Sequence, residues 1–310
     1  MIRPALTIAQ DWESYFFVAD WHALTSHPEP DVLRRATREI AATWLALGLD
    51  ADRSTLFRQS DVPEVQELAW ILGTVIPAGL LERGHAVKAA RDGGREVNAS
   101  TWWYPTLMAA DILAYGADVV PVGADQKQHV EMARDMAIKI NVRFGDDALV
   151  VPEPRVRAEV GVVPGTDGRK MSKSYGNVVP LFDTPKRTRK AIMGIVTDSL
   201  GVDEPKDPDR CTVFQLYKLL ATDDEVAEMD ADLRRGRGYG YGHAKEALAL
   251  VMERTVAMPR ECYTEWLASP ARLDEILDAG ARRARVAAAA TLDRLRERVG
   301  LHALRRGSLG

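Results

Sequence analysis

The sequence has little cysteine, no long apolar run and only a small net charge. Cys211 and Cys262 are its two cysteines in 310 residues, too few for a disulfide framework and not paired as metal ligands would be. No apolar run approaches the roughly 18 residues that cross a bilayer. The start, Met1-Ile2-Arg3-Pro4, lacks the basic-then-apolar layout of a secretion signal. We therefore expect a cytoplasmic protein with no metal site and no membrane segment.

The net charge of −4 does not by itself indicate nucleic-acid binding. Basic clusters nevertheless occur, and all lie in the C-terminal half: Lys186, Arg187, Arg189 and Lys190; Arg234, Arg235 and Arg237; Arg282, Arg283 and Arg285. A solvated surface is the simpler interpretation of each cluster. Their shared location points instead toward a polyanion that docks on this half.

The first part of the chain alternates short apolar runs with amphipathic stretches. Strands are predicted at residues 15–19, 54–57 and 118–122, and helices at 31–47, 64–72, 105–114 and 126–140. This alternation predicts an α/β fold with a doubly wound, mostly parallel, Rossmann-like sheet, whose ligands bind beyond the carboxyl ends of the strands. From Thr184 onward the strand signal disappears. We therefore predict a catalytic domain over residues 1–183 and a helical C-terminal domain over residues 184–310.

A lysine-rich loop carries the strongest chemical signal. Two glycines precede and one glycine follows Lys170-Met171-Ser172-Lys173-Ser174, so its backbone is free to move. Lys170 and Lys173 supply mobile ammonium groups, and the serines add hydroxyl donors. Such a loop can close over a triphosphate and neutralise charge on a departing pyrophosphate. An exposed basic turn is the alternative for a bare Lys-x-x-Lys, but the full pentapeptide favours function.

That pentapeptide is the signature of the class I aminoacyl-tRNA synthetases, and the rest of the chain resembles the tryptophanyl-tRNA synthetase family. The matching stretches occur in order: Val18 to Thr25, Gln59 to Glu64, Tyr104 to Leu113, Val122 to His129, Val196 to Ser199, and Gly238 to Gly242. The resemblance covers about residues 14 to 300. It implies a homodimeric tryptophan–tRNA ligase that uses ATP, Mg²⁺, L-tryptophan and tRNA(Trp), with the C-terminal domain on the anticodon side.

The resemblance also implies the amino-acid pocket. In the family, the aspartate at the position of Asp111 accepts the indole N–H, and a substrate without that group would leave a buried acceptor unpaired. A carboxylate on the helix surface is the alternative, but apolar neighbours surround Asp111 in the sequence. Tyr104, Met108 and Gln126 resemble the other pocket residues. His22 is expected near the carboxylate of the amino acid, although a lone histidine is more often structural.

The ATP site is implied in the same way. Gly123, Ala124 and Asp125 resemble the nucleotide loop of the family, whose middle residue is usually glutamate. The backbone N–H groups and the Asp125 carboxylate suit ribose recognition at the end of a strand. Val160 resembles the residue whose backbone faces adenine. Lys170, Met171, Ser172, Lys173 and Ser174 complete the predicted ATP-binding set, with Lys170 and Lys173 as the catalytic side chains.

One feature of the family is missing. Its other ATP signature, a Gly-rich turn with a His-x-Gly-His-like or Thr-x-Gly-Asn-like tetrapeptide, precedes the first helix and is absent here. Arg3-Pro4 resembles its start, but residues 5–10 run almost directly into the strand at Tyr15. We therefore expect most of the first helix to be missing, the first strand to be uncovered, and catalysis to be reduced. The chain is either a shortened enzyme or a degenerate relative.

Two rival functions remain open. A tyrosine-specific synthetase has the same architecture, but Met108-Ala109-Ala110-Asp111 and the loop before Lys170 resemble the tryptophan type. The second rival is a non-catalytic relative that binds tryptophan or tRNA. Binding of tryptophan without ATP turnover would identify that case.

Overall fold

The computed structural model describes residues 2–26, 28–82, 87, 94, 96–123, 126–156 and 162–302. The chain forms two compact units. Unit 1 comprises Met1–Ala158 and Trp266–Gly310, and unit 2 comprises Glu159–Glu265. These units do not follow the predicted division at residue 183, because the last helix of the chain packs with the first strands.

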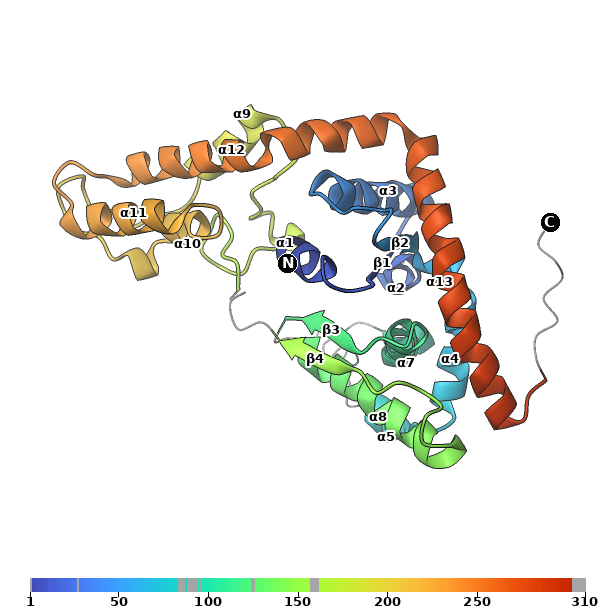
Figure 1. The fold of residues 1–310 in the computed structure, drawn as a ribbon. Helices are drawn as coiled ribbons and strands as arrows, with labels where there is room; N and C mark the ends of the chain where they lie inside the picture. The colour runs from blue at the N-terminus through green and yellow to red at the C-terminus, as the bar shows by residue number, and fades with distance from the viewer. Residues whose placement is uncertain are drawn as a thin grey trace. The chain divides into compact units, whose positions relative to one another are not determined.

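Unit 1 contains short strands paired in parallel (Figure 1). β1 (Tyr15–Val18) pairs with β2 (Thr55–Arg58), and β3 (Val119–Val122) pairs with β4 (Glu153–Val156). The predicted α/β class with parallel strands is therefore confirmed. The arrangement differs in one respect: among the described residues, the strands form two separate two-stranded sheets rather than one open sheet.

Helices surround these strands. Those of unit 1 are α1 (Ile2–Ala9), α2 (Asp20–Ala23), α3 (Pro30–Ala46), α4 (Glu64–Gly73), α5 (Ala78–Glu82), α7 (Ala99–Leu113), α8 (Lys127–Phe144) and α13 (Pro270–Val299). The helix predicted at 31–47 begins slightly earlier: Glu29 precedes its first turn, and Pro30 is its first residue, where the missing N–H costs little. Residues Ile2–Ala9 form an eight-residue helix ahead of β1.

Helix α13 packs directly against β2. A Cβ built on Gly280 would lie 1.8 Å from the carbonyl oxygen of Leu56, so only glycine permits this approach. Arg283 donates to the carbonyl oxygens of Ala51 (2.6 Å) and Ser54 (3.0 Å). Arg285 pairs with Glu64 at 3.0 Å. Arg283 and Arg285, two of the arginines predicted to meet a polyanion, therefore both bind partners within unit 1.

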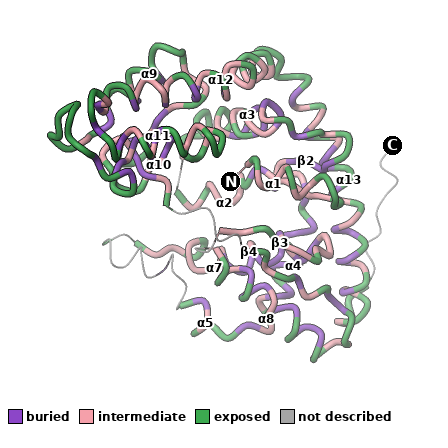
Figure 2. Tube along the Cα trace, turned by 60° about the vertical axis from the view of Figure 1, so that its left-hand side comes forward, coloured by how far each residue is buried: buried purple, intermediate pink, exposed green. Residues whose placement is uncertain are grey.

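The core of unit 1 lies between α4, α7, α8 and α13. Its largest fully buried side chains include Phe57, Leu72, Leu113, Met136 and Ile140. β2 belongs to this core, whereas β1 and β3 are only half-buried (Figure 2). Interior strands of a doubly wound sheet are normally covered on all sides. The two half-buried strands therefore mark an incompletely covered part of unit 1.

Unit 2 is helical, as predicted for the chain beyond Thr184. Its helices are α9 (Pro185–Met193), α10 (Thr212–Tyr217), α11 (Asp223–Arg235) and most of α12 (Tyr241–Ala268). Ile192, Phe214, Leu233 and Leu248 are buried in its core. Within the described ranges, no strand follows β4.

Several basic side chains of unit 2 are held by carboxylates. The pairs are Arg187–Asp183, Arg189–Glu246, Arg234–Asp230 and Arg235–Asp232. In the described part of the chain, no helix is long and apolar enough to cross a membrane.

Candidate active site

A buried carboxylate lies at the centre of the candidate site in unit 1. Asp111, in the last turns of α7, is only 2% exposed. Gln59 donates through Nε2 to both carboxylate oxygens, at 2.9 and 2.7 Å. Nε2 of His22 lies 2.9 Å from Oδ2 of the same carboxylate. A carboxylate has about four acceptor positions, so these two side chains leave capacity for the N–H of a ligand.

Burial raises the pKa of Asp111 above its ordinary value, and the hydrogen bonds and charge of His22 and the hydrogen bond of Gln59 oppose that rise. The surroundings of Asp111 therefore include two polar side chains, His22 and Gln59, besides the apolar neighbours expected from the sequence. The backbone N–H of His22 also donates to Oε1 of Gln59 at 3.3 Å, which fixes the orientation of the amide. The carboxylate is thus held in place before any ligand binds.

A second set of contacts extends from His22 toward α8. The ring of Tyr104 meets the rings of His22 and His129 edge to face, each at 5.8 Å between centroids. The hydroxyl of Tyr104 lies 2.8 Å from Nε2 of His129, and Nδ1 of His129 lies 2.9 Å from Oε1 of Gln126. The predicted residues Asp111, His22, Tyr104 and Gln126 are therefore brought together.

Helix α7 presents three predicted residues on one face. Tyr104, Met108 and Asp111 are spaced four and three residues apart, which places them one above another on a helix. Asn98 caps the start of α7 by accepting the N–H of Thr101 at 3.2 Å.

The site lies beyond the carboxyl ends of three strands. His22 follows β1, Gln59 follows β2 directly, and Gln126 follows β3. Asp20 links the first two of these segments, because its carboxylate accepts the backbone N–H of Ser60 (3.0 Å) and the hydroxyl of Ser60 (2.5 Å). Ligand sites of parallel α/β folds occur at this edge, as the sequence predicted.

Sequence reasoning missed two members of the cluster. Gln59 and His129 stand in stretches that match the family, but no role was predicted for them. Their signal was positional: Gln59 directly follows a strand, and His129 lies one helical turn after Gln126. Polar side chains at those places face the carboxyl edge of the sheet.

The lysine loop belongs to unit 2 and has its own internal organisation. Pro164 and Lys170 form an antiparallel bridge, and the N–H of Met171 donates to the carbonyl of Val163 at 2.9 Å. Lys170 and Lys173 are both exposed. Among the described residues, neither forms a salt bridge with a carboxylate, so both charges are available to an anionic ligand.

Asn177 holds this loop together. Its side chain is buried, accepts the N–H of Ser172 at 2.8 Å, and donates to Oδ1 of Asp167 (2.7 Å) and to the carbonyl of Lys170 (3.1 Å). A Cβ on Gly165 would lie 2.3 Å from its Nδ2, so the glycine makes room for the amide. The hydroxyls of Ser172 and Ser174 lie 2.8 Å apart. No role for Asn177 was predicted from the sequence.

The predicted nucleotide loop is described only at its start. Gly123 accepts the N–H of Gln126 at 2.9 Å. Ala124, Asp125 and Val160 lie outside the described residues.

Comparison with known proteins identifies the family. Residues 2–257 match the model of the family described as tRNA synthetases class I (W and Y). The chain is 44% identical to the tryptophan–tRNA ligase of Neisseria meningitidis, covering 98% of this chain and 93% of the relative. It is 47% identical to that of Rhodopirellula baltica, covering 97% and 93%.

Solved structures give the same result. The fold resembles a crystal structure of tryptophanyl-tRNA synthetase from Campylobacter jejuni complexed with ADP and tryptophan, with a TM-score of 0.88 and 41% identity over 97% of this chain and 93% of that one. The fold and the site thus define a class I aminoacyl-tRNA synthetase. Within that class, the chain belongs to the tryptophan–tRNA ligase family.

Proposed function

We propose that this chain is a tryptophan–tRNA ligase, which activates L-tryptophan with ATP and transfers it to tRNA(Trp). The buried Asp111 carboxylate, pre-oriented by Gln59 and His22 and able to accept one more N–H, is the observation that carries the proposal. The relatives named above support it, as does the Campylobacter jejuni synthetase complexed with ADP and tryptophan.

The reaction has two steps. A carboxylate oxygen of tryptophan attacks the α-phosphorus of ATP, the bond from that phosphorus to the bridging oxygen breaks, and pyrophosphate leaves. A hydroxyl at the 3′ end of the tRNA then attacks the acyl carbon, and AMP leaves. Lys170 and Lys173 stabilise the charge that develops on pyrophosphate, so their contribution is electrostatic rather than covalent.

In this proposal Asp111 accepts the indole N–H, while Tyr104, Met108 and Gln126 line the pocket and His22 lies toward the amino-acid carboxylate. The contacts of Asp111 support this assignment, since a pre-oriented acceptor rejects side chains that lack a matching donor. The same reasoning ranks a tyrosine-specific synthetase below the tryptophan-specific one.

ATP binding is assigned to three segments. Gly123, Ala124 and Asp125 recognise the ribose, and the backbone of Val160 faces adenine. Met171, Ser172 and Ser174 contact the phosphates beside the two lysines. Within the described residues, no three His, Cys, Asp or Glu side chains gather as they would around a metal ion. We assign Mg²⁺ to the substrate ATP·Mg²⁺, carried by phosphate oxygens.

The proposal includes partners. Residues 184–310 meet the anticodon side of tRNA(Trp), with the exposed Lys186 and Lys190 of α9 as candidate phosphate contacts. The working form is a homodimer in the cytoplasm, where free thiols such as those of Cys211 and Cys262 are stable. Size-exclusion chromatography with light scattering measures the oligomeric state, and a monomer at micromolar concentration would refute the dimer.

A weaker enzyme, or a relative that only binds tryptophan or tRNA, is the second candidate. The missing Gly-rich turn and the separation of the strands into two sheets favour it. Loss of one pre-organised donor to the reacting phosphate typically costs about 2.7–4 kcal/mol, or roughly 100- to 1000-fold in rate. We therefore expect adenylate formation to be slow.

One pair of measurements separates these functions. Calorimetry with tryptophan and with tyrosine tests specificity, and tryptophan-dependent pyrophosphate exchange tests catalysis. Tryptophan binding with slow exchange supports a weakened ligase. Binding with no exchange above the Lys170→Ala/Lys173→Ala double variant would support the non-catalytic relative, and preference for tyrosine would overturn the assignment.

A further inference from the structure

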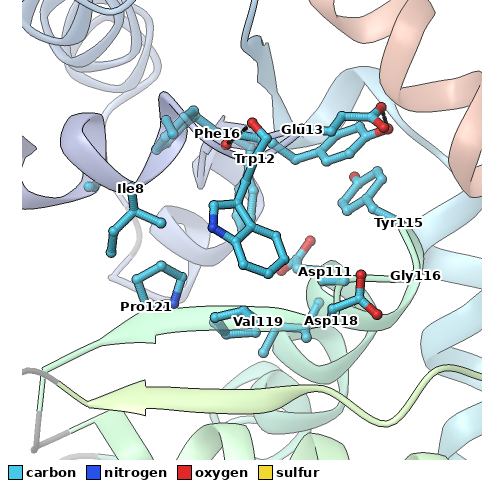
Figure 3. A pocket seen from close by; sticks show the side chains of 18 residues that line it. Ile8, Trp12, Glu13, Phe16, Asp111, Tyr115, Gly116, Asp118, Val119 and Pro121 are labelled. Carbon is cyan, nitrogen blue, oxygen red and sulfur yellow. Dashed lines mark hydrogen bonds between the residues drawn. The ribbon is translucent and has the colours of Figure 1, made fainter.

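A cavity of about 300 Å³ lies between β1 and β3 in unit 1 (Figure 3). Ser14–Phe17 line one side, Asp118–Pro121 line the other, and α1 and the end of α7 contribute the rest. No described residue of β2 or β4 lines it. The cavity therefore lies on the edges of β1 and β3 that face away from their partner strands.

Within the described part of the chain, both of those edges carry backbone groups that have no hydrogen-bond partner. The N–H of Thr55 donates to the carbonyl of Ser14, so Ser14 faces β2. Since neighbouring residues of a strand face opposite edges, Tyr15 and Phe17 present N–H and C=O to the cavity. In the same way Glu153 donates to Asp118, which leaves Val119 and the carbonyl of Pro121 facing the cavity. Among the described residues, no third strand covers either edge.

The two edges run in the same direction. β1 leads into His22 and β3 leads into Gln126, and both of these residues join the cluster around Tyr104. The carboxyl ends of the strands therefore meet at one place. A single added strand that runs parallel to both could hydrogen-bond on each of its sides.

We infer that this cavity is a binding slot for one extended peptide strand, supplied by another polypeptide, which would join the two sheets into one. Addition of a strand to an open edge is a common mode of peptide recognition, and here two open edges flank the same space.

The lining specifies the chemistry of the occupant. It contains the carboxylates of Glu13, Asp111 and Asp118, and no basic side chain is among its described residues. Glu13 and Asp118 lie just before β1 and β3, where a parallel strand would enter. The remaining surface is largely aliphatic and aromatic. The slot therefore suits a segment that begins with a basic residue and continues with β-branched apolar residues.

The side chain of Trp12 points into this space (Figure 3). It is 45% exposed although it stands among apolar neighbours such as Ile8 and Val119. An added strand would have to displace it. Its indole therefore competes with an added strand for the slot.

The test uses the full chain and the peptide acetyl-Lys-Val-Thr-Val-Thr-Val-amide. Amide hydrogen exchange is followed by NMR on ¹⁵N-labelled protein with and without peptide. Binding in the slot should slow the amides of Tyr15, Phe17 and Val119 by at least about tenfold, which is the scale of protection that backbone pairing gives. Absence of protection at millimolar peptide, or protection confined to other regions, would overturn the inference.

Two altered peptides test the chemistry. The valines occupy every second position of the peptide, so their N–H groups all face one edge. N-methylation of the valines removes these donors and should abolish the protection of the protein amides on that edge. Replacement of the leading lysine by glutamate should weaken binding several-fold because of the acidic entrance. Equal binding of the N-methylated peptide would show simple apolar adsorption and count against the slot.

Two protein variants complete the test. Trp12→Ala vacates the space and should tighten binding several-fold. Val119→Pro removes one N–H from the cavity edge but leaves the bonds to β4, and Pro121 shows that this edge already accommodates proline. This variant should bind more weakly. Concentration-dependent protection of these amides without peptide would instead identify a second copy of the chain as the occupant and overturn the inference.

Discussion

Gln59 donates to both carboxylate oxygens of Asp111, at 2.9 and 2.7 Å, and this pair organises the candidate tryptophan pocket. The two residues are 52 positions apart in the chain. They meet because Gln59 follows β2 directly, and Asp111 lies in the last turn of α7, which packs against α4, the helix that follows Gln59.

Replacing Gln59 by Leu should weaken tryptophan binding more than it weakens ATP binding. The substitution keeps the approximate volume but leaves Asp111 with His22 as its only side-chain partner. Gln59 orients the carboxylate for the indole N–H, and hydrogen bonds to a charged group are worth about 1.5–3 kcal/mol, so losing that orientation should lower the affinity for tryptophan by roughly 10- to 100-fold. Calorimetry provides the measurement, and Gln66→Leu on the exposed face of α4 is the matched control. Equal effects of the two substitutions would contradict the role of Gln59.

Asp111→Asn should change the pH dependence of folding. Burial raises the pKa of Asp111 above its ordinary 3.8, so the folded protein holds this proton more tightly than the unfolded chain does. Its contribution to stability is fully present below the ordinary value and is lost as the pH rises through the raised value. Urea unfolding between pH 4 and pH 8 should show a smaller decline for the variant. An unchanged pH profile would argue against a raised pKa.

Glu225 should show the opposite dependence. Its hydrogen bond with Arg254, followed by its bond to the backbone of Thr222, lowers the pKa of Glu225 to about 2 from 4.5. Its contribution is present above pH 4.5 and is lost as the pH falls toward about 2. Glu225→Gln should therefore flatten the acid limb of the stability curve, measured by urea unfolding. Glu228→Gln, which alters an exposed glutamate of the same helix, is the control and should leave that limb unchanged.

Gly280→Ala should destabilise unit 1 because the new methyl group would overlap the Leu56 carbonyl oxygen. Overpacking of this kind costs typically about 1–3 kcal/mol, and here the contact is with backbone that cannot rotate away. Gly242→Ala is the matched control, since no atom lies within 4 Å of its Cβ position in α12. Alanine there should stabilise the helix by roughly 0.5–1 kcal/mol. Thermal unfolding distinguishes the two changes by their sign.

Asn177→Ala should slow catalysis without altering tryptophan affinity. It removes the bonds that join Ser172, Asp167 and the carbonyl of Lys170, so the lysine loop loses its fixed geometry. A misplaced charge near the transition state commonly costs about 100-fold in rate. Pyrophosphate exchange measures the rate, and Tyr175→Phe at the exposed end of the loop is the control. A loss of tryptophan affinity equal to the loss of rate would indicate general unfolding instead.

The pattern of apolar residues predicted β1, β2 and β3 and the helices α3, α4, α7 and α8, because those segments bury one face. β4 was missed because Glu153, Pro154 and Arg155 give it no apolar run, and its pairing with β3 alone makes it a strand. The division of the strands into two sheets could not be predicted from the sequence either. Hydrophobic periodicity identifies strands but carries no information about which edges remain unpaired.

The candidate site was predicted in part. Asp111 was identified because the family resemblance implies its role, and its apolar neighbours in the sequence favour a buried carboxylate over a surface one. Gln59 and His129 carried only a positional signal and Asn177 carried none, since an isolated amide or imidazole in a sequence resembles any surface residue. Their roles depend on which segments the fold brings together.

The packing of Gly280 against Leu56 has a consequence for synthesis on the ribosome. Unit 1 needs both ends of the chain, whereas unit 2 is one continuous segment. During translation β2 emerges long before its partner helix, and unit 2 can fold in the interval. The apolar face of β2 therefore remains exposed until α13 has left the exit tunnel of the ribosome. A chaperone that shields extended apolar segments would act in that interval.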